Sequence, residues 1–75
     1  MCGIIGYIGD REAPQVLING LQKLEYRGYD SAGIAVFDHR EIKVIKTQGK
    51  VNELSRKTAA AHLSDVHCGI GHTRW

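Results

Sequence analysis

Apolar residues recur along the chain with two different periods, and each period predicts one kind of element. A short apolar run over residues 2–8 predicts a first strand. The following segment repeats its apolar residues at helical spacing, which predicts an amphipathic helix beginning near Pro14 and ending near Tyr26-Arg27. Its apolar positions are Val16, Leu17, Ile18, Leu21 and Leu24.

The second half of the chain predicts a hairpin, a second helix and a further strand. Residues 32–37 and 42–46 predict two strands joined by a polar turn at 38–41, and Gly49 ends the second strand. Residues 51–62 predict a helix, and the apolar run 66–71 predicts the next strand. The weak apolar face of that helix comprises Leu54, Ala59 and Leu63. The sequence therefore predicts an α+β fold whose uncovered sheet edges and helix faces are typical of the opening of a larger domain.

Length, charge and cysteine content exclude several classes of protein. Seventy-five residues form at most one small domain, and 43% apolar residues suffice for a globular core. The net charge of +2 is spread along the chain, so neither nucleic acid nor a membrane surface is indicated as a partner. Because the chain lacks an export signal, we expect a reducing cytoplasm, where a disulfide between Cys2 and Cys68 is disfavoured.

Cys2, directly after the initiator methionine, is the strongest candidate for chemistry. Removal of Met1 would leave a residue that carries both a thiol and a free α-amine. In short peptides a cysteine thiol has a pKa of about 8.5 and an α-amine one of about 7.7–8.0, so such an amine can act as a base for a thiol near neutral pH. The alternative is a small cysteine that merely packs in the first strand.

Nucleotide and metal motifs are not indicated. Glycines at 3, 6 and 9 do not match the dinucleotide fingerprint, and no phosphate-binding lysine follows them. The spacing of the histidines and the second cysteine fits no standard zinc module, and residues 67 and 68 on a strand would face opposite ways. That set is His62, His67, Cys68 and His72. We expect neither a metal nor another cofactor.

Three separated segments carry a resemblance to a known family. Residues 2–4 read Cys-Gly-Ile, residues 24–33 read Leu-Glu-Tyr-Arg-Gly-Tyr-Asp-Ser-Ala-Gly, and residues 71–75 read Gly-His-Thr-Arg-Trp. Together they resemble the glutamine amidotransferases of the N-terminal nucleophile class, most closely the branch that aminates fructose 6-phosphate. The resemblance implies that residues 1–75 are the opening part of a glutaminase domain, an αββα sandwich of antiparallel sheets that is incomplete at its C-terminus.

The resemblance also implies roles for individual residues. Cys2 corresponds to the nucleophile, and Arg74 to the arginine that binds the α-carboxylate of glutamine, although a surface ion pair is the ordinary role of an arginine. Arg27 and Gly28 correspond to a loop that lines the pocket, and Gly28 alone is equally a helix stop. Trp75 corresponds to a residue that gates the passage of ammonia.

The expected partners also follow from this resemblance. L-glutamine is the expected substrate of the domain; fructose 6-phosphate and a homodimeric state are expected only for a full-length protein. The sugar isomerase domains and part of the glutaminase site are absent from the 75 residues, so we expect the isolated chain to be inactive. Two alternatives stay open: another amidotransferase branch, such as one resembling the amidophosphoribosyltransferases, and a truncated product without enzymatic activity.

Overall fold

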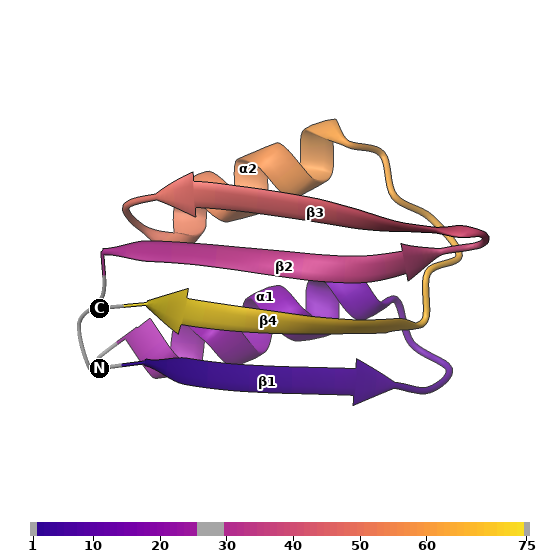
Figure 1. Cartoon of the computed structure of the whole chain (residues 1–75), viewed down its shortest axis with the longest axis horizontal. Helices are drawn as coiled ribbons and strands as arrows, with labels where there is room; N and C mark the ends of the chain where they lie inside the picture. The colour runs from indigo at the N-terminus through magenta and orange to yellow at the C-terminus, as the bar shows by residue number, and fades with distance from the viewer. Residues whose placement is uncertain (1, 26–29, 75) are drawn as a thin grey trace.

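The computed structural model describes residues 2–25 and 30–74. Within these ranges the chain forms two helices and one antiparallel sheet, with the strands in the order β1-β4-β2-β3 (Figure 1). The elements are β1 (Gly3–Ile8), α1 (Ala13–Leu24), β2 (Ser31–Asp38), β3 (Glu41–Gln48), α2 (Val51–Ala60) and β4 (Cys68–Arg74). This confirms the predicted α+β class. Neither α1 nor α2 is long and apolar enough to span a membrane.

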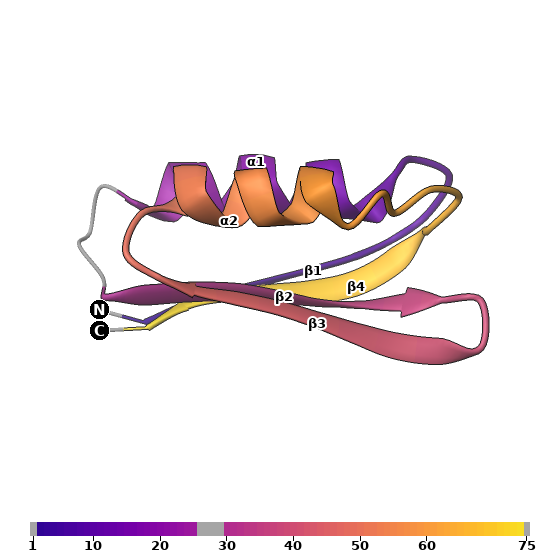
Figure 2. The same ribbon diagram turned by 90° about the horizontal axis from the view of Figure 1, so that it is seen from above.

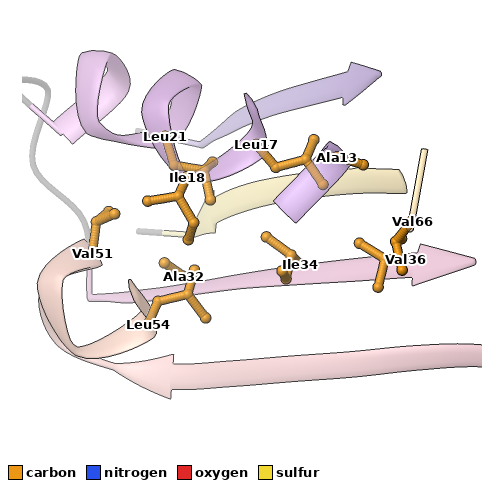
Figure 3. Packing of buried hydrophobic residues seen from close by; sticks show 10 residues of the cluster. All are labelled: Ala13, Leu17, Ile18, Leu21, Ala32, Ile34, Val36, Val51, Leu54 and Val66. Atoms are coloured by element: carbon orange, nitrogen blue, oxygen red, sulfur yellow. The ribbon is translucent and has the colours of Figure 1, made fainter. Parts of the chain in front are cut away.

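Both helices cover the same face of the sheet, and the opposite face is bare (Figure 2). The core lies between these two layers, where side chains of α1 and α2 meet those of β2 and the segment before β4 (Figure 3). Its buried members are Ala13, Leu17, Ile18, Leu21, Ala32, Ile34, Val36, Val51, Leu54 and Val66. The predicted apolar stripe of the first helix is thus largely the stripe that the structure buries.

Glycines on β4 let α1 lie close to the sheet. A Cβ atom at Gly69 would lie 3.0 Å from Leu17 Cδ1 and 2.8 Å from the Ala35 carbonyl oxygen, and a Cβ at Gly71 would lie 3.2 Å from Leu21 Cδ1. Separations near or below 3 Å are closer than carbon atoms tolerate, so a side chain at Gly69 would force α1 and the strands apart. The glycines of β4 therefore set the distance between the two layers.

Leu17 is the residue through which this packing is best tested. It is fully buried, and its replacement by alanine is expected to lower the free energy of unfolding by about 2–5 kcal/mol, because a cavity would remain between α1 and β4. The measurement is urea denaturation of the 75-residue chain followed by circular dichroism. Ile4→Ala is the matched control, since 80% of Ile4 is exposed. Equal losses in the two variants would contradict this description of the core.

The boundaries of the hairpin and of α2 agree with the sequence to within two residues. Gly49 follows β3 with a φ of +108°, a conformation that favours glycine and explains why the strand ends there. The predicted apolar face of α2 was partly wrong, because Ala59 is exposed and Thr58 is buried instead. The Thr58 hydroxyl donates to the Leu54 carbonyl at 2.8 Å, so its polar atom is satisfied inside the helix.

The third apolar run enters the sheet later than predicted. The prediction placed this strand at residues 66–71, whereas β4 spans Cys68–Arg74. Val66 is held outside the sheet because its carbonyl accepts a hydrogen bond of 2.7 Å from the backbone N–H of Ala13, at the start of α1. The polar residues of β4 are kept in the strand because β1 and β2 pair with it on both sides. The expectation that His67 lies on the strand was therefore wrong.

The bare face of the sheet is apolar over much of its area. Side chains on this face come from all four strands and remain exposed. They are Ile4, Ile8, Phe37, Ile42, Val44 and Ile70. The described residues thus supply one helical layer and one sheet of the layered sandwich that the family resemblance implies.

Candidate functional site

The start of β1 and the end of β4 bring Cys2 and Arg74 to the same end of the sheet (Figure 1). In the antiparallel register of these strands, Gly3 lies opposite Thr73, and each step along one strand is a step back along the other. Cys2 immediately precedes Gly3, so continuing this register by one residue places it opposite Arg74. Directly opposed residues in antiparallel strands have Cβ atoms about 4.5–5.5 Å apart. Two residues separated by most of the chain are therefore neighbours.

β2 and β3 extend this arrangement across the sheet. Ser31 pairs with Arg74 on one side and with Gln48 on the other. The backbone N–H of Asp30 donates to the Arg74 carbonyl at 2.7 Å, and the N–H of Gly49 donates to the Asp30 carbonyl at 3.0 Å. A cavity of about 530 Å³ lies at this place, lined by Asp30, Ser31, Gln48 and Arg74. The arginine is thus fixed through its backbone at the edge of a polar hollow.

One row of residues across the four strands lies on the bare face of the sheet: Cys2, Arg74, Ser31 and Gln48. Residues opposite one another on neighbouring strands point to the same face, and successive residues alternate between faces. Ala32 and Thr73, one step further in, are buried toward the helices, with exposed fractions of 1% and 2%. Their neighbours Ser31 and Arg74 consequently face away from the helices, and both Cys2 and Arg74 are exposed. A thiol and a guanidinium are thereby presented to the same space.

A second polar row lies next to the first on the same face. His72 pairs with Gly33, which pairs with Lys46. A Cβ atom at Gly33 would lie 3.0 Å from His72 Nε2 and 3.1 Å from Lys46 Cγ, so both side chains lean over this glycine. A cavity of about 570 Å³ adjoins it at the sheet edge and is also lined by Lys57 of α2, whose ammonium donates to the Lys46 carbonyl at 2.9 Å. One end of the bare face is therefore polar and basic, whereas the rest is apolar.

The structure brings together two of the five site residues that the sequence suggested. Cys2 and Arg74 share one end of the sheet, and both cysteines are free. Arg27, Gly28 and Trp75 lie outside the described residues.

Other residues at this end of the sheet were not singled out from the sequence. Ser31 belongs to the long family-like segment 24–33, which offered a signal that could have found it. His72 likewise belongs to the family-like segment 71–75. Gln48 and Lys46 gave no such signal, because their places depend on which strands pair and in which register.

Comparison with proteins of known sequence adds a second line of evidence. No family model matches the chain. Over all 75 residues, however, it is 53% identical to the glutamine–fructose-6-phosphate aminotransferase (isomerizing) of Thermosynechococcus vestitus and 53% identical to that of Bacillus subtilis. The enzyme of that name from Bacteroides thetaiotaomicron is 54% identical over 76 aligned residues. The chain is a relative of glutamine–fructose-6-phosphate aminotransferase. It spans only about 12% of the length of each of these relatives.

Solved structures agree with the fold. The whole chain superimposes with a TM-score of 0.81 and 31% identity on glutamine phosphoribosylpyrophosphate amidotransferase from B. subtilis, covering 16% of that chain. A structure described as the allosteric regulatory enzyme of purine biosynthesis matches equally well, again with a TM-score of 0.81 and 31% identity. The fold of this relative of the aminotransferases is therefore also that of a second amidotransferase branch, so the fold alone does not distinguish the two. The higher sequence identity favours the aminotransferase branch.

Proposed function

We propose that Cys2 is the nucleophile of a glutamine-hydrolysing site and that Arg74 binds the α-carboxylate of glutamine. The observation that carries this proposal is that Gly3 pairs with Thr73, which places Cys2 and Arg74, the next residues along, at one end of the sheet, where both are exposed. The names of the sequence relatives, which are glutamine-dependent aminotransferases, support glutamine as the substrate.

The reaction begins with removal of Met1, which frees the α-amine of Cys2. This amine accepts the thiol proton, and the sulfur attacks the carbon of the glutamine side-chain amide to form a C–S bond. The C–N bond then breaks, and ammonia leaves with the proton that the amine returns. Water hydrolyses the remaining γ-glutamyl thioester, which releases glutamate and regenerates the thiol. No cofactor is needed to balance the atoms and protons of this reaction.

Arg74 fixes the orientation of the substrate in this scheme. A guanidinium presents two parallel N–H donors to a carboxylate, and this geometry distinguishes it from the single ammonium of lysine. Its backbone pairs with Ser31 of β2, and its carbonyl accepts the hydrogen bond from Asp30, so the position of the Arg74 backbone is fixed. Binding the α-carboxylate there would leave the other end of glutamine directed toward the neighbouring thiol.

For the whole protein we propose the activity of its sequence relatives, in which ammonia from glutamine is used to convert fructose 6-phosphate to glucosamine 6-phosphate in the cytoplasm. The 75 residues are then the opening part of the glutaminase domain, and a second sheet packs against the apolar bare face. The sugar-phosphate site and the contacts of a homodimer belong to other parts of that protein. The chain covers about 12% of the length of these relatives, which leaves room for the sugar-phosphate site and the dimer contacts in the rest of the protein.

A second amidotransferase branch is the alternative, favoured by the likeness to the phosphoribosylpyrophosphate amidotransferase fold. It would use the same nucleophile but would transfer ammonia to a phosphoribosyl group. Its sequence identity of 31% is lower than the 53% of the aminotransferases, so the fructose 6-phosphate branch is preferred. Amination of fructose 6-phosphate by the full-length protein, with no reaction on phosphoribosylpyrophosphate, is the result that discriminates the two.

Intact-mass measurement of the purified protein tests the nucleophile assignment. We expect a mass that lacks Met1, because an extended Cys2 has no free amine to accept the thiol proton. Treatment with an electrophilic glutamine analogue should then add one adduct, located on Cys2 by peptide mapping. A protein that hydrolyses glutamine while retaining Met1 would refute the mechanism. A processed or unprocessed chain that never reacts would support a truncated, non-enzymatic product.

The isolated 75-residue chain is expected to release no more ammonia from glutamine than its Cys2→Ala variant. Oxyanion-hole donors are expected elsewhere in the protein, and loss of even one such donor costs about 10²–10³ in rate. The measurement is enzyme-coupled ammonia detection on both purified chains at equal concentration. Turnover clearly above the Cys2→Ala value would mean that these 75 residues already contain a working site.

A further inference from the structure

Three potential ligands meet at the end of the sheet opposite to Cys2. Glu12 immediately precedes α1, while Asp65 and His67 lie in the segment that leads into β4. His67 Nε2 is 3.0 Å from Asp65 Oδ1 and 4.0 Å from Glu12 Oε2. One donor atom from each residue lies within 4.8 Å of the other two. This Glu12–Asp65–His67 cluster joins two segments that are more than 50 positions apart in the sequence.

Backbone hydrogen bonds hold each member of the cluster in place. The N–H of Asp65 donates to Glu12 Oε1 at 2.9 Å, which leaves the second carboxylate oxygen directed to the imidazole. The Ala13 N–H donates to the Val66 carbonyl at 2.7 Å, and the Gly9 N–H donates to the His67 carbonyl at 3.1 Å. The positions of the three side chains therefore follow from the junction between α1 and β4.

The imidazole ring is oriented by a group that can only accept. His67 Nδ1 lies 2.9 Å from the Arg11 carbonyl oxygen, so Nδ1 carries the proton and donates it to this bond. In the neutral ring, Nε2 then has a lone pair directed at carboxylate oxygens of Asp65 and Glu12, which are acceptors too. A proton on Nε2 or a bound metal ion would each supply the positive charge that this arrangement of acceptors favours.

We propose that Glu12, Asp65 and His67 bind a divalent first-row metal ion, with zinc as the representative ion. A donor set of one imidazole and two carboxylates suits zinc, whose bonds to such ligands are about 2.0–2.2 Å long. Tetrahedral bonds of that length place two ligand atoms about 3.4 Å apart, so the distances of 3.0 and 4.0 Å from His67 Nε2 to the two carboxylates would each change by about half an ångström on binding. A backbone carbonyl on the other ring nitrogen is the usual outer partner of a metal-bound histidine.

This site goes beyond the proposed function and has a different role. It lies at the opposite end of the sheet from Cys2, so the ion would take no part in glutamine hydrolysis. Bound there, it would link the segment before α1 to the segment before β4 and so stabilise the junction that sets how these elements pack. Histidine spacing alone could not predict the site, since two of its three ligands are carboxylates from separate segments.

Zinc titration calorimetry on the 75-residue chain tests the proposal. Both thiols are first replaced, by Cys2→Ser and Cys68→Ser, because thiolates bind zinc on their own. At a pH of about 7.5 we expect saturable binding of one ion, weakened at least about ten-fold by His67→Gln. His62→Gln is the matched control, because His62 is an exposed histidine outside the cluster. This variant should bind zinc as tightly as the background chain, which carries only Cys2→Ser and Cys68→Ser.

Two conservative variants decide the matter if His67→Gln disturbs folding. Glu12→Gln keeps an oxygen for the Asp65 N–H, and Asp65→Asn suits the positive φ of 56° at that position. Each should weaken zinc binding while circular dichroism shows an unchanged fold. Absence of saturable binding in the background chain, equal affinity in the cluster variants, or an equal loss in His62→Gln would overturn the proposal.

Discussion

Replacement of Cys2 by alanine is expected to lower glutamine-dependent activity of the full-length protein by at least about 10³-fold. Alanine removes the only atom that can form the thioester, and no neighbouring group can substitute for it in the proposed scheme. The loss should appear in kcat, because Arg74 and the rest of the pocket would still bind glutamine. The measurement is the rate of glutamate formation at saturating glutamine, compared with the unmodified protein.

Cys68 provides the matched control for this experiment. It is the other free cysteine of the chain, and it lies on β4, at the end of the sheet away from Cys2. Cys68→Ala removes a thiol of the same kind and should leave the glutaminase rate within a few-fold of normal. Equal losses in the two variants would mean that Cys2 acts through folding rather than chemistry, and an active Cys2→Ala protein would refute the nucleophile assignment.

Much of the fold could be predicted because local patterns and packing agree. The apolar stripe of α1 is long and regular, so its buried residues Leu17, Ile18 and Leu21 could be read directly from spacing. The hairpin of β2 and β3 was equally predictable, since a polar turn and Gly49 bound its strands. Errors arose where the pattern was weak. Thr58 rather than Ala59 is buried on α2, because a hydroxyl can bond within its own helix.

Strand order and register could not be predicted from local sequence patterns. β4 lies between β1 and β2, although it comes last in the chain, and this placement depends on contacts between distant segments. It is also what brings Arg74 beside Cys2 on one side and Ser31 on the other. The sequence could therefore suggest the nucleophile and the arginine through their resemblance to a family, but it could not predict the row of residues that joins them. Gln48 and the proximity of Glu12, Asp65 and His67 were missed for the same reason.

Replacement of Arg74 by lysine is expected to raise the KM for glutamine by about 10- to 100-fold, because lysine cannot form the paired hydrogen bonds of a guanidinium with a carboxylate. The value of kcat should change much less, since lysine keeps the positive charge and leaves the thiol of Cys2 untouched. Steady-state kinetics over a wide range of glutamine concentration separate the two constants. Arg56→Lys is the matched control, because Arg56 lies exposed on α2 in a surface ion pair with Glu53 at 3.2 Å, where exchange should cost little. An unchanged KM in Arg74→Lys would refute the carboxylate role, whereas an equal fall in kcat and kcat/KM would assign Arg74 to the chemical step instead of to binding.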